Sequence, residues 1–215
     1  MICRSLPEGD LLIPQDRHAL QAGRLAALHT HLAEPRAALE RAVSLHDAGW
    51  PDLDDRPEPL DDGRPPHVFD LPHGASLPAW RRSVAIARAV GRLEALLVSL
   101  HFSGFSAFAQ EQKALQEVWR SGIDPELERA GLQTLRLCDA LSLRILCDPG
   151  ERVALPPGVR YDNGRLDPWP FLTDRIEDTV VGRLLPRRRW GSAAELRRAY
   201  EKAPTYQFCA SLKPF

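Results

Sequence analysis

The chain has 215 residues, of which 44% are hydrophobic, and its 28 basic and 29 acidic side chains leave a formal net charge of -1. This length suits one domain, or one core with a small addition. Because the charges nearly cancel, the chain has no general attraction to nucleic acid or to an anionic membrane, and neither is expected as a partner.

The first part of the sequence is dominated by helical patterns. Residues 11–13 are a short apolar run that predicts a strand before Pro14. Apolar residues then recur at helical spacing over 15–32 and over 35–48, and the second of these segments begins with a proline, which suits a first helical turn. Residues 50–78 follow as a loop rich in proline and aspartate, and a loop of that length is usually functional or disordered.

Three further helices are expected in the middle of the chain. Apolar spacing predicts them over 78–102, over 106–120 and over 124–147. Gly91 lies inside the first of these segments and is a candidate break in that helix.

The pattern changes after about residue 149. Residues 153–171 are rich in turn-forming residues, and the segment 162–164 has the Asp-Asn-Gly sequence of a hairpin turn. Strands are expected over 179–185 and over 206–212. A helix is expected between them, over 192–203, because Ser192 and Glu195 have the spacing of a capping box.

These elements predict a mainly α fold. We expect a single domain over residues 1–215, with a helical bundle over about 14–148. A small mixed α/β appendage over about 149–215 would pair its strands with the early strand over 11–13.

The four cysteines show no C-x-x-C pair, which disfavours a zinc ribbon or a thioredoxin-type motif. The first residues lack the apolar run of an export signal, and no stretch approaches the length of a membrane span. We therefore expect reduced thiols and a cytoplasmic protein. The cysteines are Cys3, Cys138, Cys147 and Cys209.

The dipeptide His46-Asp47 follows the apolar helical face formed by Leu39, Ala42 and Val43. Burying an imidazole beside a carboxylate is costly unless a partner compensates both groups, and a metal cation is the usual partner. The dipeptide therefore predicts part of a metal site.

His18 and Asp139 stand in two other apolar helical segments. Taken singly, the first is more simply a buried structural histidine and the second an ion-pair partner. Together with His46 and Asp47, they predict a metal site inside a helical bundle. Two imidazoles and two carboxylates suit iron or manganese better than structural zinc, so we expect one or two divalent ions and no organic cofactor.

The set His18, His46-Asp47 and Asp139 resembles the signature of the HD-domain superfamily, helical metalloproteins named for their paired His and Asp. Over nearly its whole length the chain also resembles an uncharacterised bacterial family that carries a domain of unknown function. The segments that carry this second resemblance are residues 15–19, 45–50, 97–101 and 138–143.

The superfamily resemblance implies two chemistries on one framework. Most members are phosphohydrolases, in which a metal-bound water attacks phosphorus. A minority are mixed-valent di-iron oxygenases, similar to inositol oxygenase and to enzymes that cleave phosphonates, and they use two further histidines for a second iron. His73 and His101 are the candidates for those two positions. If both bind, the site is dinuclear with Asp47 as the natural bridge; if neither binds, it is mononuclear.

The other candidates concern the substrate. Asp54, close after the His-Asp pair, is a candidate general base or a carboxylate that orients a histidine, and His101 is a second candidate catalytic residue. Their alternatives are a solvated loop aspartate and a structural histidine. The basic side chains that are candidates to hold an anionic substrate are Lys113, Arg81, Arg82 and Arg136.

The sequence thus predicts a metal-dependent HD-type hydrolase that acts on a small, phosphorylated and hence anionic substrate. Two alternatives remain open. One is an HD-type non-haem di-iron oxygenase on the same ligands, and the other is a non-catalytic metal-binding or regulatory protein.

Overall fold

The computed structural model describes residues 1–31, 33–72, 74–104, 106–147 and 153–215. Within these residues the chain forms eight α-helices, two short 3-10 helices and seven β-strands. The elements in chain order are β1 (Ile2–Leu6), β2 (Gly9–Ile13), α1 (Gln15–Ala27), α2 (Arg36–Leu45), α3 (Pro51–Asp54), η1 (Val68–Asp70), α4 (Leu77–Val90), α5 (Arg92–His101), η2 (Phe102–Gly104), α6 (Ser106–Arg120), α7 (Pro125–Cys147), β3 (Val153–Leu155), β4 (Val159–Asp162), β5 (Arg165–Asp167), β6 (Ile176–Leu185), α8 (Ala193–Lys202) and β7 (Thr205–Pro214).

The described strands belong to one mixed sheet with the order β1-β2-β6-β7-β5-β4-β3. β6 and β7 pair antiparallel along most of their length, from Ile176 with Leu212 to Arg183 with Thr205. β2 pairs antiparallel with the end of β6, and β5 runs parallel to β7. Residues from both ends of the sequence therefore complete the same sheet.

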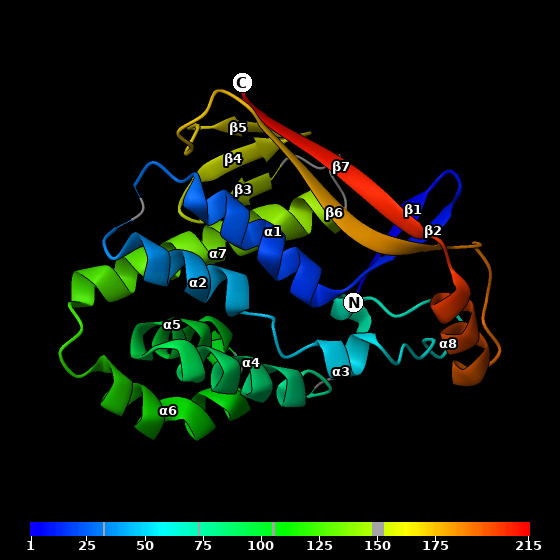
Figure 1. The fold of residues 1–215 in the computed structure, drawn as a ribbon, viewed down its shortest axis with the longest axis horizontal. Coiled ribbons are helices and arrows are strands. Elements are labelled where there is room, and N and C mark those ends of the chain that lie inside the picture. Colours follow the sequence, from blue (N-terminus) through cyan, green and yellow to red (C-terminus); the bar gives the residue numbers. More distant parts are fainter. Residues whose placement is uncertain (32, 73, 105, 148–152) are drawn as a thin grey trace.

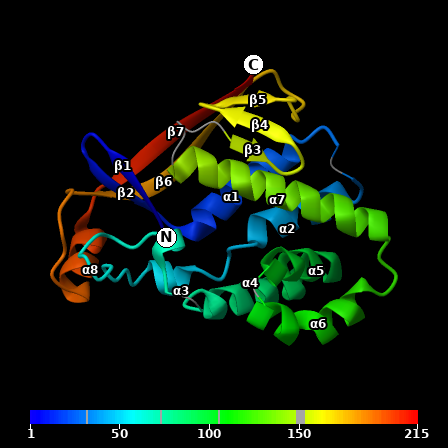
Figure 2. The ribbon, with the colours of Figure 1, turned by 180° about the vertical axis from the view of Figure 1, so that it is seen from behind.

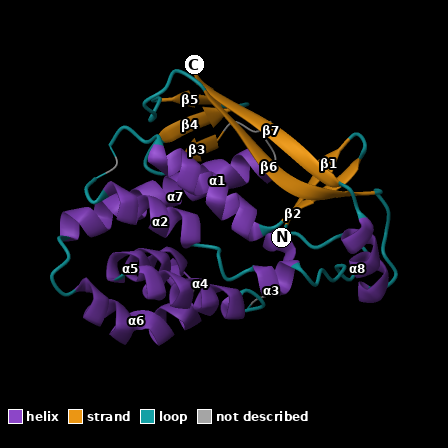
Figure 3. Ribbon diagram, in the orientation of Figure 1, coloured by secondary structure: helices purple, strands orange, loops and turns teal. Residues whose placement is uncertain are grey.

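The sheet lies along one side of the molecule and most of the helices fill the other (Figures 1 and 3). α1 and α7 run next to the sheet, α2 lies beside them, and α4, α5 and α6 form the layer farthest from the strands (Figure 1). The view from behind shows α7 between the short strands β3 and β4 and the layer of α4 to α6 (Figure 2). The helices nearest the sheet are thus enclosed from both sides.

Strands and helices share one continuous core. The main buried cluster joins Ile13, Tyr161 and Val180 from the sheet to Leu25 of α1 and Leu141 of α7. Burial alternates along β4 and along most of β6, because every second side chain of a strand points to the same face. The inner face of the sheet is therefore one wall of the core.

The expected mainly α, HD-like bundle with a small β appendage is wrong. The chain has an α/β fold in which a seven-stranded sheet, within the described residues, packs against α1 and α7. The segment after residue 149 supplies five of the core-facing strands and is not an accessory. Burying one face of the sheet together with the apolar faces of two helices removes a large apolar area from water, which favours this arrangement over separate units.

Several helix positions agree with the sequence patterns. α6 and α7 lie close to the expected ranges, and the segment 78–102 is interrupted at Gly91, whose backbone is extended with φ -175° and ψ 163°. α1 ends at Ala27, earlier than expected, because the following residues leave the helix and His29 forms a β-bridge with Phe171. None of the described helices has the length and apolar character needed to cross a membrane.

The turn signals of the C-terminal part also agree with the structure. The Ser192 hydroxyl accepts a hydrogen bond from the Glu195 amide at the start of α8, and the Glu195 carboxylate accepts one from the Gly191 amide. Asn163 and Gly164, with φ of 46° and 80°, form the turn between β4 and β5. Two consecutive positive φ values match the right-handed twist of a hairpin, which is why Asn-Gly is favoured there.

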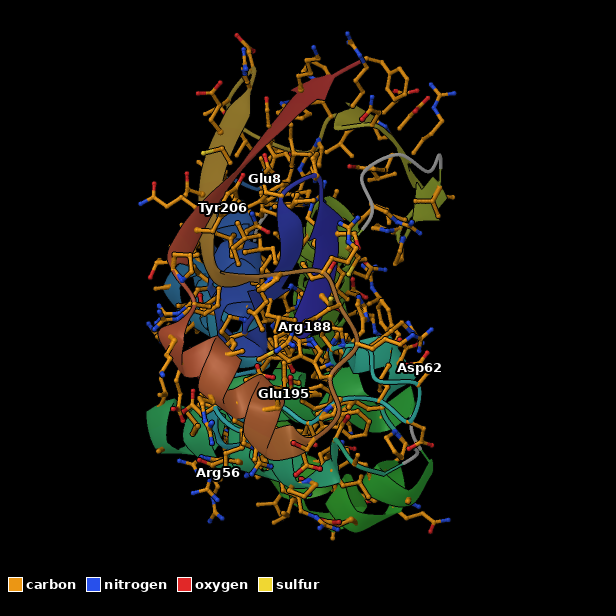
Figure 4. The ribbon with its side chains drawn as sticks, turned by 90° about the vertical axis from the view of Figure 1, so that its right-hand side faces the viewer. Glu8, Arg56, Asp62, Arg188, Glu195 and Tyr206 are labelled. Atoms are coloured by element: carbon orange, nitrogen blue, oxygen red, sulfur yellow. The ribbon has the colours of Figure 1, made fainter. Side chains whose placement is uncertain are left out.

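The long loop between α3 and α4 packs against the C-terminal part of the chain. The Trp190 amide donates a hydrogen bond to the Gly63 carbonyl. Asp62 of this loop lies on the same side of the molecule as Arg188 and Glu195, next to α8 (Figure 4). An ion pair between Arg197 of α8 and Glu58 of the loop adds a second contact, so the loop is held against the C-terminal part of the chain.

Candidate metal centre

The His46-Asp47 pair lies in the turn directly after α2, not inside the helix. α2 ends at Leu45, His46 is its C-cap, and the Trp50 amide donates a hydrogen bond to the Asp47 carbonyl. Adjacent residues inside a helix point about 100° apart and do not face one target. His46 keeps a helical backbone, with φ -58° and ψ -34°, and both side chains nevertheless reach the same buried place.

His18 in the first turn of α1 and Asp139 in α7 complete the cluster. The Nε2 atom of His18 lies 2.9 Å from Asp139 Oδ1 and 3.2 Å from His46 Nε2. His46 Nε2 lies 3.3 Å from Asp139 Oδ1. Asp47 Oδ2 lies 3.6 Å from His46 Nε2 and 3.8 Å from His18 Nε2. The structure thus brings these four predicted residues together, although they come from three separate helical segments.

Hydrogen bonds on the far side of each ring determine which nitrogen faces the cluster. The Nδ1 atom of His46 lies 2.6 Å from the Val43 carbonyl oxygen, which can only accept, so Nδ1 carries the hydrogen. The Nδ1 atom of His18 lies 2.8 Å from Ser142 Oγ, which is 2.7 Å from Gln21 Oε1 and donates its hydrogen there. In the neutral form, both rings therefore present Nε2 lone pairs to the cluster.

Two imidazole lone pairs that face each other beside two carboxylates need a cation between them. Ligand atoms about 2.1 Å from a divalent ion are about 3.0 Å apart at neighbouring corners of an octahedron and about 3.4 Å apart in a tetrahedron. The separations in the cluster, from 2.9 to 3.8 Å, cover both values. His18, His46 and Asp47 form one group of residues that fits an ion. The donor set and its spacing therefore fit a divalent metal.

The electrostatics of the cluster favour positive charge. Burial opposes a charge on the His46 imidazole, but Asp47 and then Asp139 outweigh it and raise the pKa of His46 to about 9. Burial also works against the charge of Asp139, yet its hydrogen bonds to His18 and His46 hold the pKa of this carboxyl well below its usual value. Burial raises the pKa of Asp47. A proton on His46 thus balances the carboxylates when no metal does.

His101, at the end of α5, approaches the cluster beside Asp139. Its Nε2 atom lies 3.5 Å from Asp139 Oδ2, and burial lowers the pKa of His101 to about 4. Asp139 therefore faces His101 with one oxygen and the other histidines with the second. Asp47 Oδ1 instead accepts a hydrogen bond from Trp50 Nε1 at 2.8 Å. The carboxylate placed to bridge two ions is thus Asp139, not Asp47 as expected, while His73 lies outside the described residues.

Asp54 was a candidate general base or a carboxylate that orients a histidine, but its observed partners are the Met1 amino group and the Gln15 amide. Its Oδ1 atom lies 2.6 Å from the amino group of Met1, and its Oδ2 atom accepts a hydrogen bond of 2.6 Å from the Gln15 amide. Among the described residues, its carboxylate forms no hydrogen bond with a histidine. Gln15 begins α1, where unpaired amides favour a carboxylate, so Asp54 stabilises the start of the helix that carries His18.

The basic residues considered for substrate binding differ in their partners. Arg81 forms a bidentate ion pair with Glu111, and Arg82 forms an ion pair with Asp52. Arg136 is exposed on α7 and has no ion pair within the part of the chain that the structure describes. It is therefore free to bind an anion.

A cavity of about 920 Å³ lies beside the cluster, not over it. The loop between α3 and α4 forms most of its wall, and Met1 and Asp54 also line it. Trp50 lines the cavity as well, while its indole N–H donates to Asp47. Trp50 is therefore shared by the cavity and the cluster.

Sequence reasoning missed the residues that orient the ligands. Ser142, which accepts from His18, lies three residues after Asp139 on the same face of α7. Trp50, which donates to Asp47, lies three residues after it. The three-residue spacing between Asp139 and Ser142 could have indicated that Ser142 lies near the cluster. The role of the Val43 carbonyl could not be predicted, because every residue has a backbone carbonyl.

A family model described as "Protein of unknown function (DUF3891)" matches residues 1–187 of the chain. None of the curated proteins and none of the solved structures matches it. The described cluster of metal-ligand candidates lies entirely inside the matched segment, so it belongs to the part of the chain that the family model covers.

Proposed function

We propose that this chain, which belongs to the DUF3891 family of proteins of unknown function, is a metal-dependent hydrolase of a small phosphorylated molecule. The observation that carries the proposal is the convergence of ligand atoms from His18, His46 and Asp47, which fit one divalent ion, with Asp139 Oδ1 within 3.3 Å of both imidazoles. Two imidazoles and two carboxylates favour iron or manganese over structural zinc.

The residues of the cluster would have different roles in such a site. The ion would act as a Lewis acid and supply a nucleophilic water at neutral pH. His18 and His46 would hold it through Nε2, with both rings fixed in orientation by Ser142 and by the Val43 carbonyl. This support matters because outer hydrogen bonds to metal-binding histidines set the tautomer and the direction of the ring.

The order of the candidates along the chain, His, His-Asp and Asp, is similar to that of the HD-domain superfamily, in which phosphohydrolases predominate. This similarity concerns only the order of the candidate ligands. It does not extend to the fold, because this chain contains a large sheet and the superfamily is helical. The partner we propose is a small anionic substrate, without nucleic acid or membrane. We place the reaction in a reducing cytoplasm, where cysteines such as Cys3 and Cys209 remain thiols.

A non-haem di-iron oxygenase is the second candidate function. It is favoured by a second group of residues able to hold an ion, His46, His101 and Asp139. In that case His46, His101 and Asp139 would hold the second iron, with one oxygen of Asp139 toward His46 and the other toward His101. A non-catalytic metal-binding protein is the third candidate, and the same experiment separates all three.

Phosphate release from a panel of phosphomonoesters and nucleotides tests the proposal. We expect release that depends on added Mn²⁺ or Fe²⁺ and that falls to background in Asp47→Asn, because the amide keeps the size of the side chain but not its charge. Asp61→Asn is the matched control, since Asp61 is exposed in the loop. Metal binding without phosphate release would contradict a hydrolase, and oxygen consumption with two irons per chain would favour the oxygenase.

Metal affinity is expected to rise with pH up to about 9. Below its pKa of about 9, His46 carries a proton that must leave before Nε2 can bind the metal. Each unit of pH below that value should change the apparent association constant by about tenfold, with the tighter binding at higher pH. Competition with a chelator at a series of pH values measures the slope. A flat profile between neutral pH and the pKa would show that His46 does not lose a proton on binding.

A further inference from the structure

The three described histidines of the cluster differ in how their rings are supported. His18 and His46 each direct Nδ1 to a hydrogen-bond partner. The Nδ1 atom of His101 is buried without a hydrogen-bond partner in the described part of the chain. Metal-binding histidines almost always donate their second ring N–H to a fixed partner. His101 lacks that support, so its ring is less suited to hold an ion than the rings of His18 and His46.

The cluster opens to solvent on the side of His101. The side chains of His101 and Asp139 are 14% and 17% exposed, whereas those of His18 and His46 are 0% and 1% exposed. A small molecule therefore reaches the cluster next to the Oδ2 atom of Asp139, which faces His101.

Helical spacing places Arg136 on the same side of α7 as Asp139, next to this opening. Arg136 precedes Asp139 by three residues on α7, so the two side chains share one face of the helix, and Asp139 leans toward the turn that carries Arg136. The Arg136 guanidinium is close enough for its charge to act on the His101 imidazole. It is exposed and without an ion pair among the described residues, unlike Arg81 and Arg82.

The charges of the cluster explain why such an arginine is needed. Two carboxylates and one divalent ion cancel when the imidazoles are neutral. A phosphomonoester brings up to two negative charges to a site that then has no positive charge left for it. A second metal ion or a guanidinium can compensate, and the planar donors of arginine match a phosphate well.

We propose that Arg136 and His101 form the phosphate-binding side of a mononuclear site. Arg136 binds the phosphate group through its charge and its N–H groups, and His101 donates one hydrogen bond from its ring. The inference rests on the proposed hydrolase function and narrows the substrate class to molecules with an accessible terminal phosphate, since both groups lie at the mouth of the site.

Metal counting and phosphate binding test this inference in the full chain. Elemental analysis after Mn²⁺ loading should give about one ion per chain, both in the wild type and in His101→Gln. Calorimetric titration of the Mn²⁺-loaded protein with inorganic phosphate should show affinity about ten- to a hundredfold weaker in Arg136→Ala. Arg88→Ala is the matched control and should bind phosphate like the wild type, because Arg88 is exposed at the end of α4 opposite to the α5 terminus that carries His101.

The outcomes separate this inference from the proposed function. Two ions per chain that fall to one or none in His101→Gln would overturn it, and so would phosphate affinity that Arg136→Ala leaves unchanged. An absence of phosphate binding to the loaded wild type would overturn it as well. By contrast, a wild-type chain that binds no metal, or that binds phosphate at the arginine but cleaves no phosphoester, would count against the hydrolase itself.

Discussion

His46→Ala is expected to lower the affinity for divalent metal by more than about a hundredfold and to abolish phosphate release. His46 Nε2 lies within 3.6 Å of ligand atoms of the three other residues in the cluster, so its loss removes a central ligand. Loss of an outer hydrogen-bond partner already weakens metal sites by about ten- to a hundredfold, and a direct ligand contributes more. Chelator competition gives the affinity, and elemental analysis gives the metal content.

Two variants make this result interpretable. His46 is fully buried, and alanine leaves a cavity there, so Asp139→Asn is the companion that keeps the side-chain volume and removes only the charge. Both variants should lose metal. His31→Ala removes an exposed imidazole away from the cluster and should retain it. Wild-type metal content in both His46→Ala and Asp139→Asn would mean that the four residues form a structural network and not a metal site.

The convergence of the cluster could be anticipated because each member stands beside apolar residues in the sequence. His46 follows Val43 and Ala42, and both lie in the buried face of α2. A polar residue in such a place must find a buried partner, and few partners satisfy an imidazole and a carboxylate together. The sequence could not indicate that the helix ends at Leu45 and that the pair lies in the turn after it.

The pairing of the early strand with the C-terminal strands was expected and is confirmed, but the size of the sheet and its place in the core could not be anticipated, because most of its pairings are distant along the chain. β2 pairs with β6 through Leu11 and Leu184, and β5 pairs with β7 through Leu166 and Pro214. Local periodicity indicates a strand but not its partner, so short strands at the two ends of the sequence were interpreted as a small accessory sheet. Only the shared burial of their inner faces against α1 and α7 identifies them as part of the main core.

The role of Asp54 was missed for a similar reason. A carboxylate two residues into an acidic loop segment resembles a solvated group, and its two partners are a backbone amide and an amino group, which no side-chain pattern reveals. The structure buries it almost completely, at 2% exposure. Removing a buried carboxylate that has two partners should lower the stability of the fold far more than removing a solvated loop aspartate.

Asp54→Ala is expected to destabilise the fold by about 3–5 kcal/mol. The substitution leaves the Met1 amino group and the Gln15 amide without their partner in a buried place. It also removes the only carboxylate that the described residues place on the first amide of α1 (the N-cap, Pro14, makes no side-chain hydrogen bond). Denaturant unfolding, measured with a chelator present so that metal binding does not contribute, gives the change in the free energy of unfolding.

Two further variants separate the interactions of this carboxylate. Asp54→Asn still accepts a hydrogen bond from the Gln15 amide but no longer balances the amino group, so its loss should be smaller than that of alanine. Asp61→Ala removes an exposed aspartate of the loop that follows α3 and should change stability by less than about 0.5 kcal/mol. If Asp54→Ala were no less stable than Asp61→Ala, the start of α1 would not depend on this contact. The placement of His18 would then have to come from the packing of α1 against α2 and α7 alone.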